Sequence, residues 1–216
     1  MSHVVRNEPW GVVDIVLNEG RIFFQQDWYY IWQVRPPLAD WNQAERRNFH
    51  NTADRQIWSV WSNRVRIPVR LGANPDARAT DLVNRTRGQV PINFDIRWVT
   101  RPGHYTVTAV KTHAGSSDRS EVDFGARTIT FYSHDLPASG ACTDAGVCTP
   151  NGFRTAPHEF GHTFDIDDEY GAGSPHIADT NSIMSIGNRV RPRHLQLIVD
   201  TLNRMMPGCV FSVPAA

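Results

Sequence analysis

The sequence predicts an α+β fold: a single twisted mixed sheet with a long N-terminal helix, a short helix near residue 160 and a C-terminal helix. Three observations support this. Several short segments between residues 12 and 132 alternate as half-buried strands do, two longer segments have helical spacing, and their order along the chain suits an α+β domain. The 216 residues suit one domain, with a β-rich N-terminal part at 1–37 and a core at 38–206.

The first elements are expected to be β structure over residues 12–34. An apolar run at 12–17, a turn at 18–20 and a second run at 21–24 predict a hairpin. Asp40 is a suitable N-cap for a long helix, because apolar residues recur at helical spacing from 41 to 61.

Further strands are expected at 65–71, 92–100, 105–112 and 126–132, and Pro68 indicates an edge or a bulge in the first of them. Residues 133–155 and 171–190 are rich in Gly, Pro, Ser, Thr and Asn, which predicts long loops. A final amphipathic helix is expected to begin near Pro192 and to run to about Met206.

Composition excludes several classes of protein. Hydrophobic residues make up 40% and aromatic residues 10%, so the chain can bury a core and wholesale disorder is excluded. The 22 basic and 22 acidic residues balance, so we expect no nucleic-acid partner, because neutralising phosphates requires a basic excess. The longest apolar runs are too short for a membrane span, and residues 1–9 lack the apolar stretch of a classical signal peptide.

The cysteines leave two alternatives open. Cys142 and Cys148 lie in a loop-like segment and would close a short disulfide if the protein works in an oxidising compartment. In the cytosol they would be two free thiols, and neither has the spacing of a redox or zinc-binding pair.

The chemistry is concentrated at residues 157–170, which contain the pattern HExxH. His158 and His162 are four positions apart, so a helix places them on one face, where two imidazoles can bind one metal ion at about 2.0–2.1 Å. Glu159 lies beside them and can reach a water on that metal. This arrangement suits metal-assisted hydrolysis, in which zinc acidifies the water and polarises a carbonyl while the glutamate takes the proton. The alternative is a surface helix that carries these residues by chance.

A third ligand requires the chain to turn back after the helix. Asp168, ten positions after His158, is our choice, and four other residues remain open as alternatives: Glu169, Asp165, Asp167 and His176.

The segment from His158 to Asp168 resembles the HExxHxxGxxH or HExxHxxGxxD signature of the metzincin clan of zinc metallopeptidases. The resemblance implies that His158, His162 and Asp168 bind Zn2+, that Glu159 is the general base and acid, and that water takes the fourth position. The chain departs from the signature at Asp165, where the clan has glycine, so we expect a positive φ or a side-chain-stabilised turn there.

The resemblance extends to two further segments. Residues 181–187 resemble the Met-turn, with Met184 as hydrophobic support, and the strand at 126–132 corresponds to the edge strand that pairs with an extended substrate. Tyr170 is expected to pack beside the site or to donate a hydrogen bond to an oxyanion. The basic residues at 189–194 are expected to pair with acids such as Asp167 or Glu169, to face solvent or to bind a substrate carboxylate.

These observations predict a zinc metalloendopeptidase that acts on a protein or peptide substrate. A zinc amidase acting on peptidoglycan peptides and a non-enzymatic metal-binding domain are the alternatives. A small catalytic domain without a signal peptide also resembles the toxin domains of bacterial secretion-system effectors. That resemblance implies membership of a larger secreted protein, delivery to a target cell or its periplasm, and an immunity or inhibitor partner.

Overall fold

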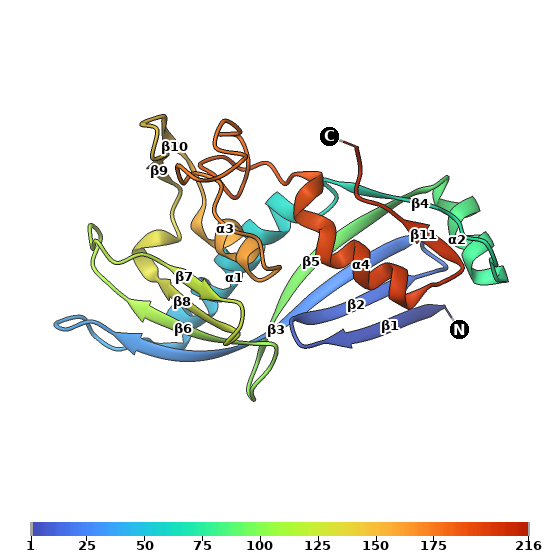
Figure 1. Ribbon diagram of the computed structural model, residues 1–216. Coiled ribbons are helices and arrows are strands. Elements are labelled where there is room, and N and C mark those ends of the chain that lie inside the picture. The colour runs from blue at the N-terminus through green and yellow to red at the C-terminus, as the bar shows by residue number, and fades with distance from the viewer. Residues whose placement is uncertain (1, 216) are drawn as a thin grey trace.

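A computed structural model describes residues 2–215 and shows a mixed α+β fold around one strongly curled sheet (Figure 1). Nine strands form this sheet: β1 (His3–Glu8), β2 (Gly11–Val16), β3 (Arg21–Val34), β4 (Arg66–Leu71), β5 (Gln89–Val99), β6 (Tyr105–Lys111), β7 (Glu121–Asp123), β8 (Thr128–Tyr132) and β11 (Cys209–Phe211). Their order is β11-β4-β5-β3-β6-β8-β7, and β1 and β2 extend the sheet beside β3. The α+β class and the mixed sheet predicted from the sequence are confirmed.

Strand β3 is the centre of the sheet because it pairs with three other strands. Its first residues form the predicted hairpin with β2, and it runs parallel to β5 and then to β6. Alternate side chains from Ile22 to Tyr30 are buried, as the period-two pattern predicts. Strands β6 and β8 are also parallel, whereas β4, β7 and β11 are antiparallel to their neighbours.

Helix α1 (Gln43–Trp61) has 19 residues and follows three strands, so it does not stand at the N-terminus. Its N-cap is Asn42, and the prediction of Asp40 is wrong. Asn42 accepts a hydrogen bond from the backbone N–H of Glu45, whose carboxylate accepts one from the backbone N–H of Asn42. This reciprocal pair satisfies two N–H groups at the helix start, whereas the Asp40 carboxylate accepts from the N–H of the adjacent Trp41, which precedes the helix.

Several elements differ from the prediction. The sequence patterns did not predict β1, β7, β11 or α2 (Ala77–Thr86). The expected loop at 133–155 contains the short 3-10 helix η1 (Ser133–Asp135) and a two-stranded hairpin of β9 (Ser139–Cys142) and β10 (Cys148–Phe153). The C-terminal helix is divided into the 3-10 turn η2 (Pro192–Leu195) and α4 (Gln196–Met205).

Two predicted edges of the sheet are also wrong. Strand β4 is not an edge, because β11 pairs with its last three residues and Pro68 lies where the pairing changes from β5 to β11. Strand β8 is not an edge either, because β7 pairs with Thr128–Thr130 and is the last described strand at that end of the sheet.

The core places the short helix α3 (Thr155–His162) against the sheet and α1. Phe160 contacts the rings of Phe24, Phe94 and Trp61, and all four side chains are buried. Trp61 Nε1 also donates a hydrogen bond to Pro157 O at 2.9 Å. Helix α3 is therefore fixed from the sheet side and from α1 (Figure 1). Among residues 2–215, no helix combines the length and the apolar composition that crossing a membrane requires.

Candidate metal centre and cleft

Three side chains from α3 and from the segment that follows it converge. Asp168 Oδ1 lies 3.0 Å from His158 Nε2 and 3.3 Å from His162 Nε2, and the two Nε2 atoms are 3.3 Å apart. The structure therefore brings together the two histidines of the HExxH pattern and the aspartate at the predicted spacing. These three residues could hold a metal ion.

Hydrogen bonds to the backbone fix the orientation of both imidazoles. His158 Nδ1 lies 2.7 Å from Ile183 O, and His162 Nδ1 lies 2.6 Å from Ile166 O. A carbonyl oxygen can only accept, so each Nδ1 carries a proton and donates it, and each Nε2 faces Asp168. Such outer hydrogen bonds are typical of histidines that bind metals.

The three facing atoms require positive charge between them. Two imidazole lone pairs and a carboxylate oxygen repel one another unless a cation or a proton lies between them. Burial lowers the pKa of His162, but the carboxylates of Asp168 and Glu159 outweigh burial and raise it. Tetrahedral coordination at about 2.0–2.1 Å separates ligand atoms by about 3.3–3.4 Å, close to the spacing observed here. The donor set and its spacing therefore fit a tetrahedral ion such as zinc.

The turn after α3 adopts the predicted conformation. Asp165 has φ 60°, in the left-handed region that aspartate tolerates better than most residues. Tyr170 donates a hydrogen bond from its hydroxyl to Asp168 Oδ2 at 2.7 Å, and its ring stacks near that of His158. Tyr170 thus packs beside the site and leaves Oδ1 of Asp168 to face the two imidazoles.

The other candidates for the third ligand lie elsewhere. Arg193 donates to both carboxylate oxygens of Glu169 at 2.7 Å, and His194 Nε2 lies 3.2 Å from Glu169 Oε1. This confirms the predicted pairing of the basic segment with Glu169 and leaves that carboxylate fully engaged. Three further candidates are exposed and lie outside the converging group: Asp165, Asp167 and His176.

The turn at 181–187 supports both halves of the site. Ile183 O accepts from His158, and Met184 O accepts from Glu169 N–H at 2.7 Å. Met184 is fully buried beneath α3, in van der Waals contact with Gly161. A single turn therefore positions the first histidine and the segment that carries Asp168.

Glu159 lies next to the converging group and is almost fully buried. Its Oε2 atom has no hydrogen-bond partner within the described residues, and burial raises the pKa of the carboxyl above its ordinary value. It faces a cleft of about 240 Å³. Also lining the cleft are Arg119, Ser120, Asp135, Ser139, Gly140, Ala141, Cys142, Phe153, Thr155, His158, Tyr170, Ser185 and Ile186.

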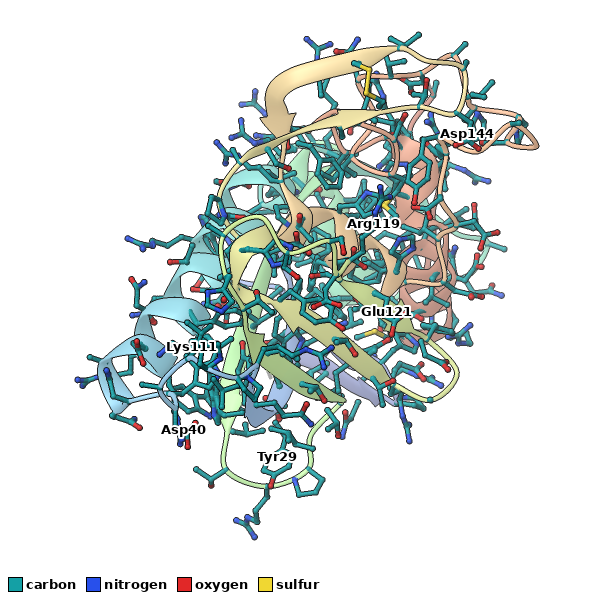
Figure 2. All side chains as sticks on the ribbon, turned by 90° about the vertical axis from the view of Figure 1, so that its left-hand side faces the viewer. Tyr29, Asp40, Lys111, Arg119, Glu121 and Asp144 are labelled. Atoms are coloured by element: carbon teal, nitrogen blue, oxygen red, sulfur yellow. A yellow bond between two sulfur atoms is a disulfide. The ribbon has the colours of Figure 1, made fainter. Side chains whose placement is uncertain are left out.

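The β9–β10 hairpin forms one wall of this cleft. Cys142 and Cys148 are disulfide-bonded and are not free thiols. At the tip, Asp144 N–H donates to Tyr170 O at 3.2 Å and its carboxylate accepts from Ala172 N–H. Figure 2 shows the disulfide on the hairpin at the top of the molecule and Arg119 below it. The hairpin is thus attached to the loop that carries Asp168.

Arg119 and Asp135 line the cleft beside Glu159, and sequence analysis singled out neither. Neither residue lies in a recognisable motif, and only the sheet topology brings them to the site. For the β9–β10 hairpin, the sequence contained one indication, the closely spaced pair Cys142 and Cys148.

Comparison with protein-family models, with curated proteins and with solved structures gives no match for this chain.

Proposed function

We propose that this protein is a zinc-dependent metalloendopeptidase in which His158, His162 and Asp168 hold the ion. The observation that carries the proposal is the convergence of His158 Nε2, His162 Nε2 and Asp168 Oδ1 beside the buried Glu159, which lines a cleft. A structural metal site usually engages four protein ligands and has no spare glutamate, so the arrangement favours an enzyme over a metal-binding domain.

Zinc, when bound, would lower the pKa of a water molecule and polarise the carbonyl of the substrate. Glu159 would accept a proton from the attacking water and deliver it to the leaving nitrogen. Its burial suits this role, because a raised pKa brings a carboxyl closer to the range in which it both accepts and donates protons. Tyr170 holds Asp168 in place through its hydroxyl and covers one side of His158.

An extended peptide is the substrate that suits the cleft. The cleft lies between the β9–β10 hairpin and the residues that lead into β7. Because β7 ends the described sheet on this side, its free edge would offer backbone N–H and C=O groups to a peptide. We therefore propose β7, and not residues 126–132, as the strand that would pair with a substrate.

We also propose that the protein acts in an oxidising compartment such as the periplasm. The Cys142–Cys148 disulfide supports this location, because disulfides persist in oxidising compartments. We retain delivery as a toxin domain of a larger secreted protein, with an immunity or inhibitor partner, as part of the same proposal.

Cleavage of unfolded proteins, mapped by mass spectrometry, tests the proposed activity. We expect cleavage by the wild-type protein, its loss after chelation, and a loss of at least about 10²-fold in Glu159→Gln. Glu19→Gln, at an exposed turn far from the site, is the matched control and should retain full activity. Wild-type activity in Glu159→Gln would refute the proposal, and cleavage of purified peptidoglycan alone would favour the amidase alternative.

A further inference from the structure

A second cavity, of about 540 Å³, is lined by four arginines: Arg64, Arg154, Arg189 and Arg191. It lies where the end of α1, the start of α3 and the segment after residue 187 meet, and it shares no lining residue with the cleft. Its other described lining residues are neutral: Ser59, Val60, Asn188 and Val190. Its volume is within the range of about 300–1,000 Å³ that small-molecule sites occupy.

Two of the guanidinium groups are held in place by one serine. Arg64 donates from Nε and Nη2 to Ser59 O at 3.0 and 2.6 Å, and Arg154 donates from Nη1 to Ser59 Oγ at 3.2 Å. Each guanidinium has five N–H donors, so both retain donors for another acceptor. The two cations are therefore pre-positioned close together with unused donors.

The other two arginines also have unused donors. Arg191 pairs with Asp179, but its Nε atom is buried and has no hydrogen-bond partner among the described residues. Both backbone groups of Arg189 are bonded within the turn, to Asn181 and Ile183, so its Cα is fixed. Its side chain makes no hydrogen bond or ion pair to the side chains that the structure describes.

The side chains that line this cavity carry an excess of positive charge, although the formal net charge of the chain is zero. Elsewhere arginines pair with carboxylates, as Arg97 does with Asp27 and Arg193 with Glu169. Within the described residues, Asp179 is the one carboxylate within ion-pair distance of any of the four cavity arginines. Like charges gathered in this way repel one another, and a bound anion would remove that repulsion.

We propose that this cavity binds a multiply charged oxyanion, of which the phosphate dianion is the simplest. Guanidinium groups bind phosphate oxygens through paired N–H donors, and several such groups favour a ligand with more than one charge. The proposal is independent of the hydrolytic activity, because no residue of the metal centre takes part in it.

Calorimetric titration with inorganic phosphate at constant ionic strength tests this site. We expect saturable binding of about one phosphate per chain, and weaker binding of acetate. Arg64→Gln and Arg189→Gln should each weaken phosphate binding by at least about tenfold, since each removes one charged contact. Arg85→Gln, on an exposed helix where the arginine pairs with Asp81, is the matched control and should not change the affinity.

His158→Ala separates this cavity from the metal centre, because phosphate can also bind a metal ion. Phosphate affinity should be unchanged in that variant. Unsaturable binding, equal affinity for acetate, or equal weakening in Arg85→Gln would overturn the proposal. So would binding that is lost in His158→Ala but retained in Arg189→Gln.

Discussion

Replacing Gly161 by alanine should destabilise the protein, although alanine is normally the better helix former. A Cβ at residue 161 would lie 2.1 Å from Met184 Sδ, 3.0 Å from Met184 Cε and 3.3 Å from Trp61 Cζ2. Both neighbours are fully buried, so neither can move freely. The helix preference of alanine contributes about 1 kcal/mol, whereas overpacking a core costs about 1–3 kcal/mol. The net loss is therefore up to about 2 kcal/mol, and the 2.1 Å approach to Met184 Sδ favours the upper part of that range.

A double-mutant cycle with Met184→Ala isolates this contact. Met184→Ala alone should cost about 2–5 kcal/mol, because it leaves a cavity under α3. In the double variant the new methyl group occupies part of that cavity, so the loss should be smaller than the sum by at least about 1 kcal/mol. Denaturant unfolding followed by circular dichroism measures each free energy of unfolding.

Gly173→Ala is the control for this cycle, because no atom lies within 4 Å of a Cβ at that position. Its free energy of unfolding should match that of the wild-type protein. Additive losses in the cycle, or a Gly161→Ala variant more stable than the wild type, would show that Met184 does not pack closely against α3.

Three further predictions concern the ligand, the hairpin and acid stability. Asp168→Ala should weaken metal affinity at least tenfold by calorimetry, whereas Glu169→Ala should retain it but unfold at lower denaturant concentration, because Arg193 loses two hydrogen bonds and keeps only its pairing with Asp179. Reduction of the Cys142–Cys148 disulfide should destabilise the hairpin by up to about 2 kcal/mol, which faster amide hydrogen exchange in 139–153 would reveal. Burial alone would raise the pKa of Asp179, but hydrogen bonds from arginines outweigh it and lower the pKa, so the stability that Asp179 contributes should be lost below about pH 4. Asp179→Asn should reduce this acid sensitivity in thermal melts, and an unchanged profile would contradict the assigned pairing.

Local sequence patterns correctly predicted the helices and strands that depend mainly on neighbouring residues. The hairpin of β2 and β3 follows from alternation on either side of a turn, and α1 follows from helical spacing. The segment 133–155 has a loop-like composition, yet a disulfide and contacts to Tyr170 hold it as a hairpin. The sequence around Pro68 could not show that β4 lies inside the sheet. The strand that covers β4, β11, comes from the C-terminal end of the chain and pairs with the residues that follow Pro68.

The candidate site was predictable where its residues lie close in sequence. HExxH places two histidines on one helix face with a glutamate next to the first of them, and Asp165 adopts the positive φ expected of the turn. The hydrogen bonds from His158 to Ile183 O and from His162 to Ile166 O could not be predicted. Every residue has a backbone carbonyl group, so the sequence does not show which one will accept. The engagement of Glu169 with Arg193 excludes it as a ligand, and the sequence alone had left that choice open.

Metal content of the purified protein tests the central claim most directly. Elemental analysis should find about one zinc per chain in the wild type and in Glu159→Gln, because Glu159 lies beside the ligand atoms without being one of them. His158→Ala and His162→Ala should each lose most of that zinc, since each removes one of three protein ligands. Full zinc occupancy in the double histidine variant would contradict the account, because the metal would then be bound elsewhere.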